Sequence, residues 1–186
     1  MNRFHGLARR MRAAHQFWQA GVADLTLEQA NHHERAGVLP ISFTLLHYIK
    51  GEDSRASERL SDQEPLWMTG GWAEKIGVSL PDVSRGTPME ESETLRFADL
   101  DAWRAYQTAV FEQTEALLTA SEDGSWDEVI FERVPEGLRG GFLDALVESG
   151  RVTLGDYLET VLYQHCVRHL GELEHARALV GLGGLS

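Results

Sequence analysis

The chain has 186 residues, of which 42% are hydrophobic and 25% are charged. This composition is typical of a soluble globular protein, and no run approaches the roughly 18 consecutive apolar residues that a membrane span needs. The formal net charge of −12 repels phosphate backbones, and no stretch gathers enough lysines and arginines to oppose it. We therefore expect no membrane segment and no nucleic-acid partner.

The N-terminal segment, MNRFHGLARRMRAAHQFW, is basic, but it lacks an unbroken apolar core and a small-residue cleavage site. It is therefore not expected to be a secretory signal. The single cysteine, Cys166, cannot form an internal disulfide, which agrees with a reducing compartment. We expect a cytoplasmic protein with one domain, 1–186, that carries an insertion.

Hydrophobic spacing predicts four long helices. The first ends near Gly21, and Thr26 can cap a short helical turn over residues 27–32. The second covers about 40–60 and the third about 99–120. The fourth has Thr153 as its N-cap and ends at Gly181. The apolar stripe of the first helix consists of Phe4, Leu7, Met11, Ala14 and Trp18.

The connections between these helices contain little regular structure. Residues 61–94 hold too many prolines and glycines for a long element, so we expect a long link with a short helix at 72–76. A strand at 128–134 and a short helix at 141–148 are expected between the third and fourth helices. The prediction is an all-α four-helix bundle with small insertions, in which the long link allows a crossover.

The fourth helix contains the stretch YQHCVRHLGELEHARALVG, residues 163–181. At about 100° per residue, His165, His169 and Glu172 share the apolar face of this helix, whereas Glu174 and Arg177 lie on its far side. Two imidazoles four residues apart can bind one metal ion. The alternative is that both histidines lie at the edge of the core and form hydrogen bonds with neighbours.

A metal site with catalytic capacity normally needs a third ligand from elsewhere in the chain. His47 is the best candidate because it lies in the middle of the second helix. It lies opposite the apolar residues of that helix, so either the helix is buried on two sides or His47 lines a polar cavity that solvent reaches. Gly51, one turn further on, would leave space beside the metal.

Several other conspicuous residues are predicted to have structural roles. Cys166 is rotated by about 100° from His165, so it is expected to pack against a neighbouring helix. Glu52, Asp53 and Glu58 are expected to form a solvated, charged helix end. Trp103 and Tyr106 are expected in the core, although either could wall a substrate pocket. His175 is expected at the surface. His32 and His33 are expected in a polar loop, with a second metal site as the alternative.

The stretches HCVRHLGELEHARALVG, PISFTLLHYIKGED and GWAEKIGV together resemble the DinB superfamily of bacterial metal-binding four-helix bundles. The resemblance covers the chain from the first helix to Gly181. It implies a divalent metal ion, often zinc or nickel, held by His47, His165 and His169. It also implies a homodimer, which the apolar faces of the first and third helices suggest as well. Some relatives are transferases or isomerases that use a low-molecular-weight thiol, and many have no assigned activity.

Three neutral imidazoles leave the charge of the ion uncancelled, so a bound water or thiol would lose its proton more readily. We therefore expect a metal-dependent S-transferase or isomerase that acts on a small-molecule substrate with a thiol cosubstrate. A metal-water hydrolase and a non-enzymatic metal-binding stress-response protein are the alternatives. Glu172 is the candidate catalytic residue, although it could also orient an imidazole or form a salt bridge.

Overall fold

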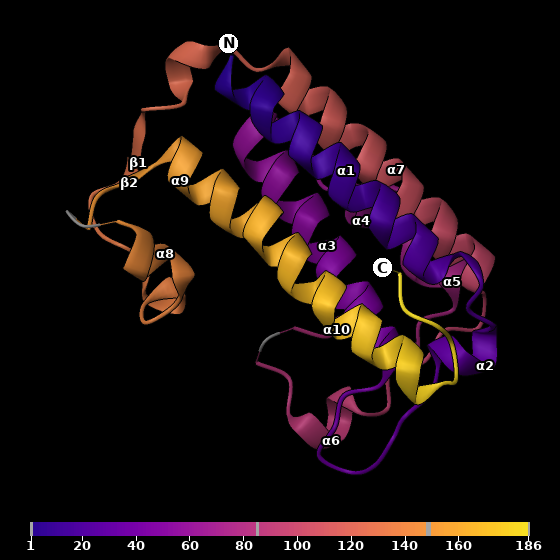
Figure 1. The fold of residues 1–186 in the computed structure, drawn as a ribbon. Helices are drawn as coiled ribbons and strands as arrows, with labels where there is room; N and C mark the ends of the chain where they lie inside the picture. Colours follow the sequence, from indigo (N-terminus) through magenta and orange to yellow (C-terminus); the bar gives the residue numbers. More distant parts are fainter. Residues whose placement is uncertain (1, 85, 148–149, 186) are drawn as a thin grey trace.

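The computed structural model describes residues 2–84, 86–147 and 150–185. The protein is all-α, with 64% helix and 3% strand. Figure 1 shows long helices that run side by side, with shorter elements at the periphery. No helix in the described ranges combines the length and the apolar character that crossing a membrane requires. The long elements are α1 (Arg3–Ala23), α3 (Ile41–Leu60), α7 (Leu100–Ala120) and a rod made of α9 (Leu154–Leu158), η3 (Glu159–Gln164) and α10 (His165–Leu179).

The long elements contact one another in a closed ring. Helix α1 packs against α7 and α10, and α3 packs against the same two helices from the other side. In Figure 1, α1 and α7 form one edge of the molecule, and the rod from α9 to α10 crosses in front of α3. This arrangement brings α3 and α10 together, although about 100 residues of chain separate them.

Side chains and glycine mark the helix ends where the sequence predicts them. Thr26 and Thr153 both form capping boxes, Thr26 with Gln29 and Thr153 with Asp156. Gly181 has a φ of 78°, a left-handed conformation that suits the residue after a helix. The predicted helix boundaries therefore hold to within a few residues.

The short elements agree in part with the prediction. The helix expected at 72–76 is present as α5, and the expected strand at 128–134 is reduced to β1, which pairs antiparallel with β2. The helix expected at 141–148 is present as α8, and residue 148 lies outside the described residues. Helices α4 and α6 were not predicted. The short elements are α2 (Leu27–Ala30), α4 (Leu66–Thr69), α5 (Trp72–Ile76), α6 (Met89–Ser92), η1 (Asp123–Ser125), β1 (Val129–Phe131), η2 (Glu136–Leu138), α8 (Phe142–Leu146) and β2 (Val152–Thr153).

The prediction of one regular fourth helix is wrong. Residues Glu159–Gln164 form a π-helix between α9 and α10. A π-turn holds more residues than an α-turn, so the helical wheel drawn at about 100° per residue does not carry through this segment. The faces of α9 and α10 therefore have separate registers.

The core lies between the four long elements. The predicted stripe of α1 is buried, as are Trp103 and Tyr106 on α7 and Cys166 on α10. The apolar faces of α1 and α7 therefore pack inside the chain itself. The homodimer stays a prediction, and these faces no longer support it.

Two acidic residues of α3 contradict the prediction of a solvated helix end. Glu52 and Asp53 are fully buried, and only Glu58 of the three is exposed. Glu52 accepts a hydrogen bond of 2.5 Å from the Tyr48 hydroxyl, and its other oxygen lies 3.0 Å from Nε2 of His15. A buried carboxylate is tolerated when it is paired in this way. Acidic residues that usually indicate a solvent-exposed helix end can therefore lie in the interior.

Asp53 is satisfied by different partners. Its carboxylate accepts hydrogen bonds from the backbone amides of Leu66 and Trp67, at 2.9 and 2.8 Å, and from the Tyr106 hydroxyl at 2.8 Å. The two amides lie at the start of α4, where a negative charge is favourable. Asp53 thereby attaches the beginning of the long link to the middle of α3.

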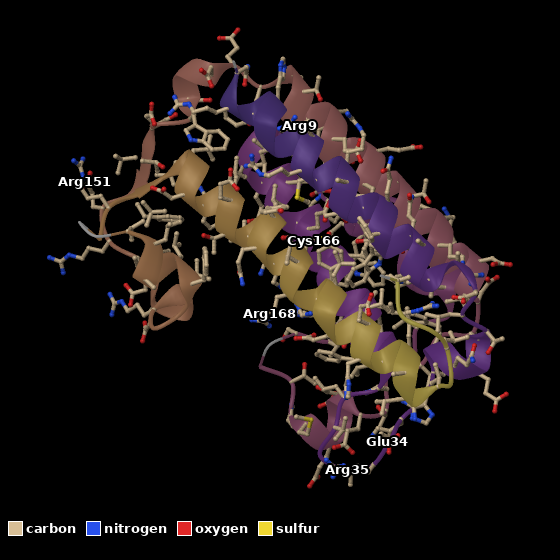
Figure 2. All side chains as sticks on the ribbon, viewed as in Figure 1. Arg9, Glu34, Arg35, Arg151, Cys166 and Arg168 are labelled. Atoms are coloured by element: carbon tan, nitrogen blue, oxygen red, sulfur yellow. The ribbon has the colours of Figure 1, made fainter. Side chains whose placement is uncertain are left out.

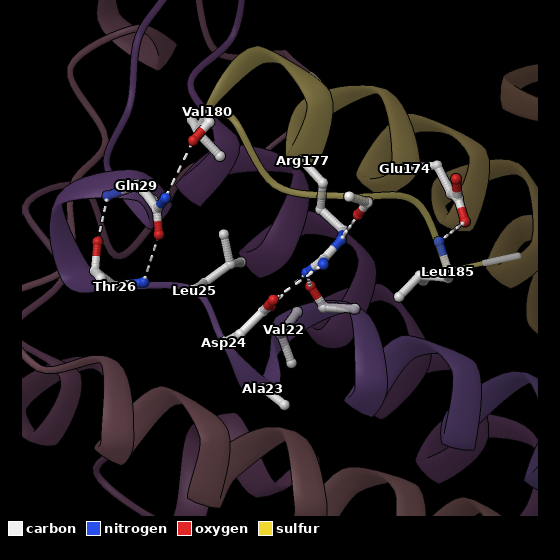
Figure 3. Close-up of polar contacts among 12 residues, drawn as sticks. Val22, Ala23, Asp24, Leu25, Thr26, Gln29, Glu174, Arg177, Val180 and Leu185 are labelled. Carbon is white, nitrogen blue, oxygen red and sulfur yellow. Dashed lines mark hydrogen bonds and ion pairs between the residues drawn. The ribbon is translucent and has the colours of Figure 1, made fainter.

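Arg177 was expected on the far side of the fourth helix, but its side chain is buried. Nη1 donates a hydrogen bond of 2.7 Å to the carbonyl oxygen of Gly21, and Nε donates one of 2.9 Å to that of Gly183. The guanidinium also pairs with Asp24, as Figure 3 shows. Arg177 therefore joins the end of α1 to the C-terminal tail.

We expect the pKa of His15 to lie above its ordinary value of about 6.5. Burial lowers this pKa, but the carboxylates of Glu52 and Glu115 raise it by more. Because the folded chain holds this proton more tightly than the unfolded chain, the resulting stabilisation is complete below pH 6.5 and is lost as pH rises through the folded pKa.

An NMR titration of the imidazole protons measures this pKa, and the variant His15→Gln assigns the resonance. A midpoint below 6.5 would contradict the paired, charged state of His15.

Candidate metal centre

Three histidines from two helices converge on one point. His47 comes from α3, and His165 and His169 lie one turn apart on α10. Each offers a ring nitrogen, and the three nitrogens all lie within 4.8 Å of one another. The structure therefore brings together the three histidines that were predicted to share one site. For His165 and His169, the alternative had been separate hydrogen bonds at the edge of the core.

The spacing of the nitrogens suits a metal ion. Nε2 of His165 and Nε2 of His169 lie 3.0 Å apart. The ring centroid of His47 lies 5.6 Å from that of His165 and 5.3 Å from that of His169. Ligands at about 2.0–2.1 Å from a tetrahedral zinc ion would be about 3.3 Å from each other. Small side-chain rotations would therefore give three bonds of normal length.

Glu172 orients one of these ligands. Its carboxylate lies 2.6 Å from Nδ1 of His169, which leaves Nε2 facing the other two histidines. A carboxylate behind a ligating histidine fixes the tautomer and strengthens the ligand. The hydrogen bond from His169 lowers the pKa of Glu172, so this group is a stable acceptor at neutral pH. This geometry supports the orienting role for Glu172.

The imidazoles of His47 and His165 stay neutral at physiological pH. Burial, together with the charges of His169 and Arg55, lowers the pKa of His47 to about 4 and that of His165 to about 2. A metal ion binds the neutral form of imidazole. Both groups are therefore ready to bind a metal without first losing a proton.

A cleft gives access to the three histidines. It has a volume of about 590 Å³ and is lined by His47 and His165 but not by His169, which is buried. Both alternatives for α3 are therefore realised, since the helix is buried at Glu52 and Asp53 while the His47 side faces a cleft. Further parts of its wall come from α6 and the segment before it, from residues 137–143 and from η3.

The space predicted beside Gly51 is filled. A methyl group on Gly51 would overlap Nη1 of Arg55 and would lie 3.5 Å from Cε1 of His165. The absence of a side chain at Gly51 thus lets the guanidinium lie against α3, next to the histidines. Arg55 was not predicted to belong to the site, although its spacing of four residues from Gly51 places both on one side of a helix.

The remaining histidines and the cysteine lie outside this cluster. His32 pairs with Glu34, His33 lies 3.6 Å from Glu93, and His175 is exposed as predicted. Cys166 is buried among the long helices, whereas Arg168 projects away from α10, as Figure 2 shows. Burial raises the pKa of the Cys166 thiol to about 12, so this group is not a nucleophile at neutral pH.

Comparison with known proteins supports the fold alone. Neither the models of known families nor the curated proteins include a match to this chain. Among solved structures, the chain is similar to a conserved protein from Enterococcus faecalis, with a TM-score of 0.73 and 21% sequence identity over 93% of this chain and 94% of the other. The helices thus follow a path that an experimentally determined protein also follows.

We expect the purified protein to bind about one divalent ion per chain and the variant with both His165→Ala and His169→Ala to bind none. Plasma mass spectrometry after reconstitution with zinc or nickel measures the metal content. The control is His175→Ala, which removes an exposed histidine from the same helix. A parent protein that takes up no metal would show that the three imidazoles have only a packing role.

We expect Glu172→Gln to weaken metal binding by about tenfold, because the amide supports the His169 tautomer less well than a carboxylate does. Competition with a chromophoric chelator measures the affinity. The control is Glu112→Gln, an exposed position on α7. Equal affinities for the parent and Glu172→Gln would assign the carboxylate to its surface ion pair with Arg168, 3.7 Å away.

Proposed function

We propose that the chain is a divalent-metal-dependent enzyme that uses a low-molecular-weight thiol, either as an S-transferase or as an isomerase. Its fold would be a single four-helix bundle of the DinB-like type, 1–186, with a long crossover link. The metal would be zinc or nickel, held by His47, His165 and His169. The substrate would be a small molecule.

The observation that carries this proposal is the access of solvent to the histidine cluster. An ion that only braces helices needs no opening, yet His47 and His165 line a cleft of about 590 Å³, within the size range of small-molecule sites. Three protein ligands leave a coordination position for a fourth group, which is the arrangement of catalytic rather than structural metal sites.

Different residues of the chain have different roles around this opening. A bound divalent ion would supply the charge that lowers the pKa of a thiol or a water. Glu172 holds the ring of His169 in place, and the lowered pKa values of His47 and His165 keep both imidazoles neutral. The cleft walls provide apolar surface from Phe43 and Phe142 for the rest of the substrate.

A thiol is favoured over water as the group to be activated because no side chain suited to act as a general base lines the cleft. Among the described lining residues there is no aspartate or glutamate, and the two histidines are the proposed ligands. Hydrolysis by a metal-bound water generally needs a base of this kind. A thiolate, once formed, is itself the nucleophile.

We expect small thiols to change the visible absorption spectrum of the cobalt-substituted protein in a saturable manner, because a thiol would enter the fourth coordination position. The alcohol of the same size serves as the control ligand, and His165→Ala as the control protein. A spectrum that no thiol changes would contradict thiol activation. If chelation then also caused a large fall in melting temperature, the non-enzymatic metal-binding role would be favoured.

A further inference from the structure

The cleft beside the histidines is cationic, although the chain as a whole is acidic. The formal net charge is −12, yet the described residues that line the cleft include Arg55, Arg139 and Arg168 and no carboxylate. A cleft lined by one sign of charge concentrates ligands of the opposite sign. The wall chemistry therefore selects a ligand that carries negative charge.

Arg55 differs from the other two arginines because it has a buried nitrogen without a hydrogen-bond partner among the described residues. Nε of Arg139 donates to the carbonyl oxygen of Val134, and Arg168 is 60% exposed and lies near Glu172. Nη1 of Arg55 is buried and has no hydrogen-bond partner among the described residues. A buried cationic donor without a partner is unfavourable, so this group is suited to bind an anion.

Nη1 of Arg55 lies close to the histidines. The guanidinium lies over Gly51, on the side where a methyl group would approach Cε1 of His165. Arg55, His47 and His165 also line the same cleft. A small molecule that reaches the histidines through the cleft therefore passes within reach of Arg55.

We propose that Arg55 binds a carboxylate group of the small molecule that occupies the cleft beside His47, His165 and His169. The guanidinium fork matches the two oxygens of a carboxylate. This assignment rests on the proposed function, which supplies the thiol as the second group of the ligand. The preferred ligand is accordingly a thiol that carries a carboxylate a few bonds from its sulfur.

The test compares three probes on the cobalt-substituted protein by calorimetry and by absorption spectroscopy: 3-mercaptopropionate, 2-mercaptoethanol and succinate. We expect the parent to bind 3-mercaptopropionate about tenfold more tightly than 2-mercaptoethanol, because a hydrogen bond between charged groups is worth about that factor. Arg55→Gln should remove this preference, and 2-mercaptoethanol, which has no carboxylate, measures any change that the variant causes at the metal itself.

A second variant, Gly51→Ala, tests the same contact in case Arg55→Gln does not fold. Gly51→Ala keeps the arginine but pushes its flexible end away from the histidines, so it should also reduce the preference for 3-mercaptopropionate. Arg168→Gln is the matched control, since it removes the same charge from an exposed position in the same cleft. It should change the preference by no more than about twofold.

The outcomes separate the anion site from the thiol function. A preference that survives in Arg55→Gln, or a parent that binds neither 3-mercaptopropionate nor succinate, would overturn the assignment of Arg55. If neither thiol binds but succinate binds the parent and not Arg55→Gln, the anion site stands and the thiol function fails. If both thiols bind the parent equally, the thiol function stands and the anion site fails.

Discussion

Glu52 and Asp53 are buried next to each other on α3, and each is held by groups from a different part of the chain. Successive residues of a helix point about 100° apart, so both carboxylates keep their partners at only one rotation of α3. A buried carboxylate that loses its partners costs several kcal/mol. The rotation that satisfies both is also the one that directs His47 toward α10, and the metal centre depends on it.

The candidate site combines groups with opposite requirements. Imidazoles must stay neutral to bind a metal, and the positive charge of Arg55, which together with burial keeps them neutral, also favours an anionic ligand nearby. Arg55 serves both purposes because Gly51 allows it to approach α3. The acidic groups of the interior have other partners, His15 and the hydroxyl groups of two tyrosines.

The parts of the structure that could be predicted are those that depend on local pattern. The stripe from Phe4 to Trp18 and the caps Thr26 and Thr153 are properties of neighbouring residues, and they specify the helices. His165 and His169 share a face for the same reason. His47 could be selected because it lies in the middle of a predicted helix, but its approach to the pair on α10 depends on how the two helices pack. Helices as short as α4 and α6 contain too few residues for a periodic pattern. The burial of Glu52 depends on His15, which is distant in sequence, and no local pattern shows that pairing.

The π-helix at Glu159–Gln164 is equivalent to one residue inserted into an otherwise regular helix. Removal of that residue would restore regular hydrogen bonding, but it would rotate everything after it by about 100° relative to α9. His165 and His169 would then turn away from His47, while the apolar anchor of α9 stayed in place. Because of this less regular backbone, one long helix can pack its N-terminal half into the core and also direct two imidazoles toward α3. A shorter, more regular helix would lose the centre, and it would also turn Cys166 and Leu173 away from the core.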